Sequence, residues 1–170
     1  MRRAVLCVPL ALSLLPAALA ESPRGPWAGY KAGSFVKTKT VTVVKVGAHK
    51  IETVTDITQT LIEVKGDRAV VETIANMNGV PRPTRTRSDV ALKQPLPPPA
   101  GARRRSGKES LTVAGRTLQC DWTESESDMA GNRTTVKTWT SPNVPGGVAK
   151  TVSRNELMES TLEIVAFEAK

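Results

Sequence analysis

The side chains that most often perform catalysis are scarce in this sequence. Its single histidine, His49, lies in the turn-like segment Gly47-Ala48-His49-Lys50 between two strand-like runs. A general base needs a pocket and an orienting partner, and the residues around His49 supply neither. The sequence also has no Gly-x-Ser-x-Gly elbow for a hydrolase and no glycine-rich phosphate loop ahead of a helix. We therefore expect no enzymatic activity, no cofactor and an exposed His49.

Cys120 lies in the clearest apolar–polar alternation of the chain. Leu118, Cys120 and Trp122 are apolar, and the residues between them are polar. Because side chains alternate between the two faces of a strand, these three residues share one apolar face. A reactive thiol needs thiolate character and access, whereas a core thiol needs only small size and apolarity. We predict that Cys120 is a core residue, and a surface thiol or intermolecular disulfide is the alternative.

Three acidic residues, Glu124, Glu126 and Asp128, also alternate and share a face near a predicted turn. Calcium sites use such oxygens together with converging carbonyl groups. This run lacks the ligand spacing of known calcium loops. We therefore predict a solvated acidic strand end and no metal site.

Arginines concentrate in the middle of the chain, on a predicted strand and in the loop after it. They are candidate contacts for an anionic ligand or surface. The alternative is a solubilising role in a disordered loop. Nucleic acid is disfavoured because stacking aromatic residues are few. The candidate residues are Arg82, Arg85, Arg87, Arg103, Arg104 and Arg105.

Residues 1–20 have the pattern of a cleaved signal peptide. Two arginines precede an apolar run that ends near Pro16, and the segment closes on Ala18-Leu19-Ala20. The run is too short to span a bilayer, so we expect no transmembrane segment in the mature chain. The full chain has 170 residues and a formal charge of +8, and removal of the leader leaves 150 residues, a charge of +6 and one cysteine. We expect export to the periplasm or the exterior.

The rest of the chain is rich in β-branched residues separated by turn signals. Such residues favour strands, and two-residue signals such as Asn78-Gly79 favour hairpins. We expect residues 21–33 to form a lead-in segment and residues 34–170 to form a single β domain, with a Pro/Arg-rich loop at 93–108. The predicted strands lie within 35–44, 51–64, 69–77, 80–92, 109–113, 116–126, 133–141 and 148–152.

The C-terminal segment, residues 153–169, fits two structures. Ser153-Arg154-Asn155-Glu156 matches a helix capping box, whereas Leu162–Phe167 matches a strand. We favour the strand because every other element is β. The predicted fold is therefore mainly β, an antiparallel meander of about eight or nine strands that forms a curved sheet or half-barrel.

Two segments carry a resemblance to known proteins. Pro26–Val36 (Pro-Trp-Ala-Gly-Tyr-Lys-Ala-Gly-Ser-Phe-Val) resembles the opening of a group of small uncharacterised secreted bacterial β-meander proteins. Trp139–Lys150, with its Ser-Pro-Asn-Val-Pro-Gly-Gly turn, is similar to a second hallmark of that group. More remotely, the pattern is similar to periplasmic lipoprotein-carrier half-barrels, which hold acyl chains on a concave sheet. The resemblance implies a final strand at the C-terminus and transfers no site residue.

These observations favour a non-catalytic secreted or periplasmic protein that binds an apolar or amphipathic, lipid-like ligand on a concave sheet. Basic residues would meet an anionic headgroup, and the apolar face of Leu118, Cys120 and Trp122 would contact the ligand body. The alternative is a structural module of the envelope that binds a protein or an acidic polysaccharide and no small ligand.

Overall fold

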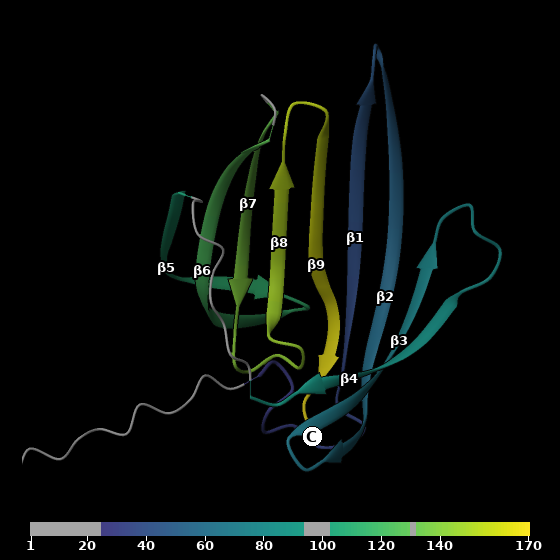
Figure 1. Cartoon of the computed structure of the whole chain (residues 1–170), viewed down its shortest axis with the longest axis vertical. Helices are drawn as coiled ribbons and strands as arrows, with labels where there is room; N and C mark the ends of the chain where they lie inside the picture. Colours follow the sequence, from purple (N-terminus) through teal and green to yellow (C-terminus); the bar gives the residue numbers. More distant parts are fainter. Residues whose placement is uncertain (1–24, 94–102, 130–131) are drawn as a thin grey trace, which may run out of the picture.

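The structure, a computed structural model, describes residues 25–93, 103–129 and 132–170 (Figure 1). The predicted signal peptide, residues 1–20, lies outside this range. In the described part of the chain, no helix has the length and apolarity needed to cross a bilayer. The strands are β1 (Phe35–Val46), β2 (His49–Lys65), β3 (Arg68–Met77), β4 (Thr84–Ala91), β5 (Arg103–Val113), β6 (Arg116–Met129), β7 (Asn132–Thr140), β8 (Val148–Arg154) and β9 (Met158–Glu168).

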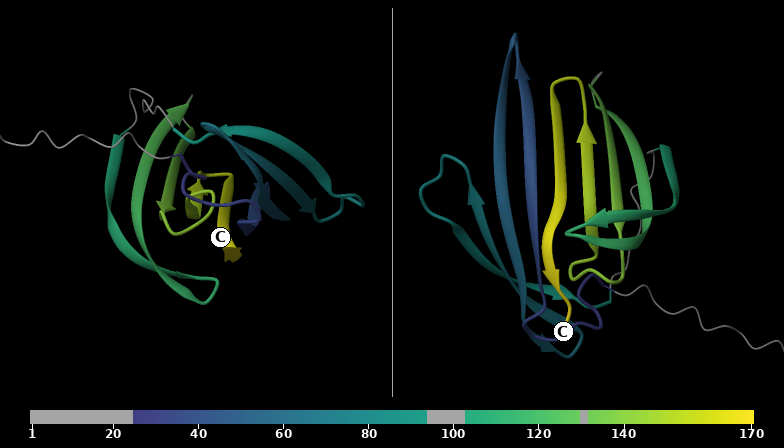
Figure 2. Two further views of the ribbon diagram at one scale, coloured as in Figure 1. Left: turned by 90° about the horizontal axis from the view of Figure 1, so that it is seen from below. Right: turned by 180° about the vertical axis from the view of Figure 1, so that it is seen from behind.

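The nine strands form one antiparallel sheet in the order β4-β3-β2-β1-β9-β8-β7-β6-β5. Two meanders, β1–β4 and β5–β9, meet at the centre, where β1 pairs with β9 from Phe35 opposite Glu168 to Val44 opposite Met158. The sheet is curved but not closed, and its outer edges are β4 and β5 (Figures 1 and 2). The predicted mainly β, antiparallel meander is confirmed.

The C-terminal segment forms strand β9, as we favoured. Of the residues that resemble a helix cap, Ser153 and Arg154 end β8, and Asn155 and Glu156 lie in the turn between β8 and β9. The Asn155 side-chain oxygen accepts hydrogen bonds from the backbone N–H groups of Leu157 and Met158, at 2.9 and 2.7 Å. An Asn side chain can bond the backbone nearby in a tight turn as readily as at a helix start, so the local pattern did not decide between the two.

Two predicted boundaries were wrong. Residues 103–108, which we placed in the Pro/Arg-rich loop, begin strand β5, and Arg103 to Arg105 pair with Glu126 to Glu124 of β6. Cross-strand pairing with an acidic strand outweighs the loop-like composition of this stretch. Arg82, which we placed on a strand, precedes β4 in a bend between Pro81 and Pro83. Proline cannot donate to a ladder, and the strand begins only after both.

Charged residues are divided unevenly between the two faces of the sheet. Residues opposite each other in register share a face, and one such row runs from Trp122 through Trp139, Lys150 and Glu163 to Lys39. On the seven strands from β4 to β7 in sheet order, every Asp, Glu, Lys and Arg lies on the face of this row. We call it the charged face and the opposite one the neutral face. Charged residues of β5 and β6 that lie on the neutral face are Arg104, Lys108 and Asp121.

The two ends of the sheet bury opposite faces. Leu61 and Val71, which are opposite each other on β2 and β3, are buried on the neutral face. Leu118, Cys120 and Trp139, on β6 and β7, are buried on the charged face. The β3–β4 hairpin and the β5–β6 hairpin curl away from the central strands to opposite sides (Figure 2). Each end thereby covers its own apolar residues.

The lead-in segment covers the lower part of the neutral face. Trp27 is buried, and Tyr30 donates a hydrogen bond to the carbonyl oxygen of Pro142 at 2.5 Å. A Cβ atom placed on Gly146, in the β7–β8 turn, would lie 3.6 Å from both the Trp27 ring and the Val36 side chain. Lead-in and turn thus close over the start of β1, as expected for a segment that anchors two aromatic residues.

Candidate functional site

A stack of three side chains lies on the charged face where the β5–β6 end curls over. Trp122 and Trp139 are opposite each other on β6 and β7. The Lys137 ammonium lies 4.4 Å from the ring centroid of Trp122 and 4.5 Å from that of Trp139. Glu109 of β5 accepts a hydrogen bond from the Trp139 indole N–H and lies 3.7 Å from the Lys137 ammonium. Cation–π attraction and the carboxylate together fix both rings.

The stack depends on a glycine in the edge strand. Gly107 is opposite Trp122, and a Cβ atom placed there would lie 2.9 Å from two ring atoms of that indole. Real Cβ atoms do not approach that closely, so only glycine allows the Trp122 ring to lie over the β5 backbone. Gly107 therefore fixes the position of Trp122 relative to β5.

A groove of about 300 Å³ opens beside this stack. It is lined by Leu111 from β5, by Trp139 and Lys137 from β7, and by Val152 from β8. Leu111 and Val152 come from strands that lie three places apart in the sheet. They line one groove because the β5–β6 hairpin curls over the charged face. We call this cavity the Trp groove; its remaining lining residues are Glu124, Thr135, Lys150 and Arg154.

The cations of the Trp groove have carboxylate partners. The Lys150 ammonium lies 3.7 Å from Glu163, and the Arg154 guanidinium lies 2.9 Å from Glu159. Lys137 is shared between Glu109 and the two Trp rings. The groove is therefore amphipathic, with an apolar floor and a rim of exchangeable ion pairs.

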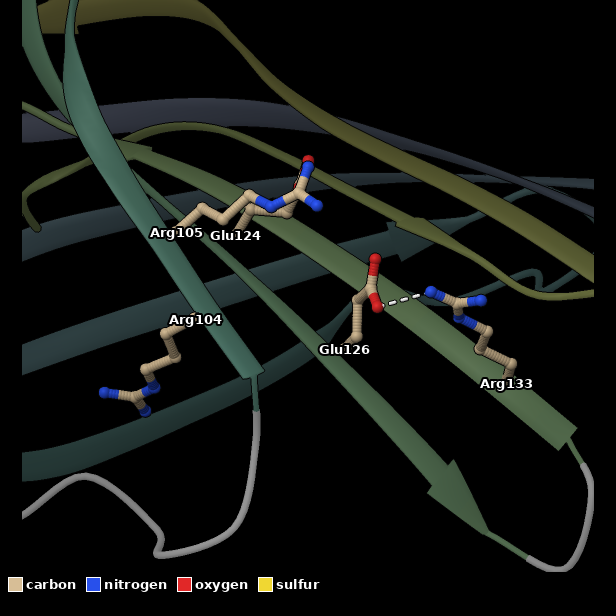
Figure 3. Close-up of a pocket in the computed structure, with 5 residues that line it drawn as sticks. All are labelled: Arg104, Arg105, Glu124, Glu126 and Arg133. Atoms are coloured by element: carbon tan, nitrogen blue, oxygen red, sulfur yellow. Dashed lines mark hydrogen bonds and ion pairs between the residues drawn. The ribbon is translucent and has the colours of Figure 1, made fainter.

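A second hollow, of about 350 Å³, adjoins the Trp groove and is lined by charged residues only. Glu124 lines both cavities. Arg105 lies 3.9 Å from Glu124, and Arg133 donates a hydrogen bond to Glu126 (Figure 3). The Arg104 side chain points away from these pairs (Figure 3). This hollow places a cluster of charged residues beside the groove.

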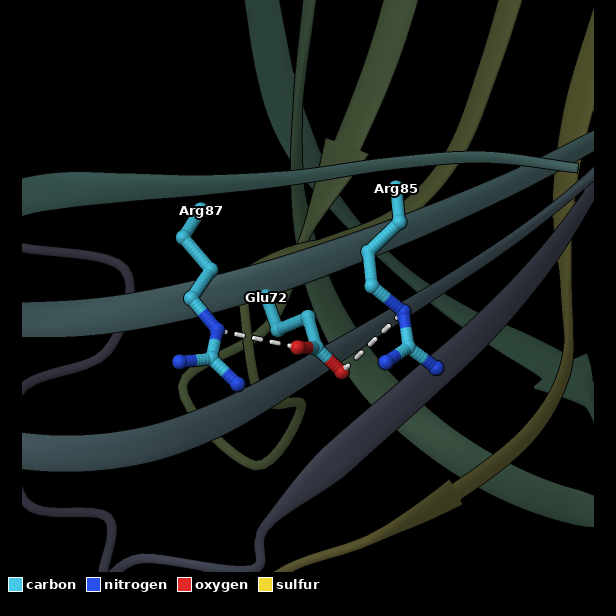
Figure 4. Close-up of polar contacts among 3 residues, drawn as sticks. All are labelled: Glu72, Arg85 and Arg87. Carbon is cyan, nitrogen blue, oxygen red and sulfur yellow. Dashed lines mark hydrogen bonds and ion pairs between the residues drawn. The ribbon is translucent and has the colours of Figure 1, made fainter.

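The other predicted arginines lie at the opposite edge of the sheet. The Glu72 carboxylate of β3 lies between two guanidinium groups (Figure 4). Its oxygens are 3.0 Å from Arg87 Nε and 4.0 Å from Arg85 Nε. Arg82 is exposed in the preceding bend. β4 and β5 are the two sheet edges, so the six candidate arginines do not form one site. Of the candidate arginines with described side chains, Arg105 adjoins the Trp groove through its ion pair with Glu124.

The predicted apolar face divides into buried and accessible residues. Leu118 and Cys120 are 6% and 3% exposed, which confirms Cys120 as a core residue and removes both from contact with a ligand. Burial raises the pKa of the Cys120 thiol, and the nearby carboxylates of Glu109 and Asp121 raise it further. The thiol therefore stays protonated and is a poor nucleophile. Trp122 is partly exposed and can contact a ligand.

The remaining sequence candidates lie apart from the groove. His49 is exposed at the tip of the β1–β2 hairpin. Within residues 25–93, 103–129 and 132–170, no three His, Cys, Asp or Glu side chains come together as a metal site. Glu124 and Glu126, from the predicted acidic strand end, take part in the ion pairs with Arg105 and Arg133.

Sequence reasoning missed the residues at the centre of the groove. Lys137, Trp139 and Val152 lie on strands that we predicted, but nothing singled them out as a site. The available signal was the alternation of Thr135, Lys137 and Trp139 on one face of β7. That pattern shows a shared face, and it does not show that β5 curls over it.

Comparisons with known proteins identify the fold alone. No protein-family model matches the chain, and no curated protein sequence does either. Among solved structures, the chain is similar to a "putative lipoprotein" from Parabacteroides distasonis, with a TM-score of 0.54 and 11% sequence identity. The match covers 85% of this chain and 99% of the other. At that identity the similarity shows a shared β-sheet fold with a bacterial protein.

Proposed function

We propose that this chain is an exported, non-catalytic protein that holds an amphipathic ligand in the Trp groove. The observation that carries the proposal is the composition of that groove. Leu111, Val152 and Trp139 offer apolar surface to an acyl-like body, and Lys150 and Arg154 stand at the rim for an anionic head. The volume, about 300 Å³, is at the lower end of the range for small-molecule sites. Export is supported by the leader pattern of residues 1–20 and by a structural neighbour described as a lipoprotein.

The paired cations do not prevent binding of an anionic head. Exposed ion pairs contribute only about 0–1 kcal/mol, because water screens them and side-chain entropy opposes them. An incoming carboxylate or phosphate can therefore replace Glu163 or Glu159 as the partner of Lys150 or Arg154 at little cost. We expect modest affinity that weakens as salt concentration rises.

The apolar half of the proposal is tested with laurate, below its critical micelle concentration, by isothermal titration calorimetry. Val152→Gln places an amide in the groove and should weaken binding about tenfold, or about 1.4 kcal/mol. Val136→Gln makes the same change on the neighbouring strand but on the neutral face, and should leave the affinity unchanged. Equal affinities in both variants, or no heat with wild-type protein at millimolar laurate, would contradict the proposal.

The head-group half is tested by comparing laurate with dodecanol, which has the same chain and no charge. A Lys150→Ala/Arg154→Ala double variant should weaken laurate binding several-fold and leave dodecanol binding close to wild type. A similar loss for both ligands would show that the two cations support the fold of the groove and do not bind the head.

A second candidate function, an envelope interaction module, is favoured by the arginines of the outer strands. Edge strands present unpaired backbone groups, and Arg85 and Arg87 on β4 add positive charge beside them. An acidic polysaccharide such as polygalacturonate would then bind the β4 edge. Loss of that binding in an Arg85→Ala/Arg87→Ala variant, together with no binding of laurate to wild-type protein, would favour this function over the first.

A further inference from the structure

In the part of the chain that the structure describes, the central part of the neutral face is open and free of formal charge. It is formed by β7, β8, β9, β1 and β2, which lie side by side as a single layer (Figure 1). Its side chains are mostly Thr, Ser and aliphatic residues, and they include Thr40, Thr55, Thr151, Ser160 and Leu162. Hydroxyl groups meet across strands, with Thr42 2.9 Å from Ser160 and Thr151 3.4 Å from Thr138.

The distribution of charge is that of one layer of a two-layer protein. Domains are usually built from two packed layers, and a sheet that faces water on one side carries its charges on that side. Here the charged face takes every charge of seven strands. The neutral face has the composition of an inner surface, and in the described residues the lead-in, the β7–β8 turn and the curl of the β3–β4 hairpin cover only its lower part and its β3–β4 end.

We propose that the open neutral face packs against the same face of a second copy of this chain. Hydroxyl groups both donate and accept hydrogen bonds, so a face rich in Thr and Ser is complementary to itself. An apolar lipid surface would leave those hydroxyls without partners, and a charged polymer would find no opposite charge there. Face-to-face packing about a twofold axis also leaves both charged faces in water.

The area of the face is sufficient for a stable dimer. Five strands spaced about 4.8 Å apart span about 24 Å, and about seven residues along each strand span about 24 Å. Two copies would therefore cover roughly 1,200 Å² in total, above the roughly 1,000 Å² expected of a biological interface.

The test is sedimentation velocity of the purified protein from about 1 to 200 µM in 150 mM salt, with two variants of adjacent residues. Ser160→Lys puts a charge on the neutral face, and Thr161→Lys puts the same charge on the charged face. We expect a wild-type dimer whose dissociation constant rises at least tenfold in Ser160→Lys and stays within twofold in Thr161→Lys. A wild-type monomer at 200 µM, or equal effects of the two variants, would overturn the inference.

Small-angle X-ray scattering of the wild-type protein decides the geometry even where Ser160→Lys does not fold. Two sheets packed about 10 Å apart give a thicker particle with little increase in its maximum dimension. A longer particle of unchanged thickness would indicate edge-to-edge pairing and overturn the inference. Laurate titration of a folded Ser160→Lys monomer keeps the two proposals separate, because the Trp groove opens on the face opposite Ser160.

Discussion

The two ends of the sheet bury apolar side chains on opposite faces. The β1–β4 half buries Leu61 and Val71 on the neutral face, in a cluster that includes Trp27 of the lead-in. The β5–β9 half buries Leu118 and Trp139 on the charged face, where Lys137 and Glu109 must be accommodated as well. In the described residues, the core of the first half therefore contains no charged side chain. The second forms a core with polar groups along its margin, and that margin is the Trp groove.

Truncation of Leu61 should have the largest effect and should destabilise the β1–β4 half. Its side chain is fully buried, so Leu61→Ala should lower the free energy of unfolding by about 2–5 kcal/mol. Ile62→Ala, at the adjacent exposed bulge position, should change it by about 0.5 kcal/mol or less. Urea unfolding of the two variants makes the comparison, and similar losses would show that Leu61 is not a core anchor.

Gly107→Ala should come next, and it acts on the β5–β9 half. The added methyl group would meet the Trp122 ring, so the ring or β5 must move, at about 1–3 kcal/mol. Ser106→Ala, one residue earlier and exposed, is the matched control. Urea unfolding and near-ultraviolet circular dichroism of the Trp region should both change in Gly107→Ala alone. An unchanged spectrum would mean that Trp122 does not lie over the β5 backbone.

Lys137→Met should have a smaller effect, because it keeps the apolar stem and removes only the ammonium. The loss of two cation–π contacts and one ion pair should lower stability by about 0.5–2 kcal/mol. Lys39→Met, on the charged face of β1, provides a control of the same residue type. Urea denaturation in 1 M NaCl tests whether the Lys137–Glu109 ion pair contributes to this stability difference. If it does, salt screening should reduce the difference in free energy of unfolding between wild type and Lys137→Met.

Ionisation of the Cys120 thiol should have the smallest effect on stability, and the effect should be visible only at alkaline pH. Its pKa is raised in the folded protein, so the folded state retains the proton more strongly than the unfolded state. Its stabilising contribution is present below the ordinary thiol pKa and is lost as pH rises through the raised value. Between pH 7.5 and 10, wild type should therefore lose more stability than Cys120→Ala, as measured by urea midpoints. Parallel profiles would contradict the buried, protonated thiol.

Local patterns predicted the elements of this fold well. Runs of β-branched residues and turn signals located every strand, and the alternation around Cys120 identified its buried face. What they could not provide was the pairing of β1 with β9, which joins residues more than a hundred positions apart. Such pairing depends on matching two complete strand faces rather than on any short motif.

The site was less predictable than the fold. The six arginines looked like one cluster because they are close in sequence, but β4 and β5 lie at opposite edges of the sheet. The residues at the centre of the groove, such as Lys137, have no distinctive spacing. Their proximity to Leu111 arises from the curl of the β5–β6 hairpin over the charged face.

The central claim, that an amphipathic ligand binds on the charged face in the Trp groove, is tested most directly by the indole N–H signals in a ¹⁵N correlation spectrum. The chain has three Trp residues, and each gives one such signal. On titration with laurate, the signals of Trp122 and Trp139 should shift, and that of Trp27, which belongs to the lead-in on the neutral face, should stay in place. Three unmoved signals at saturating laurate, or a shift of Trp27 alone, would contradict the account.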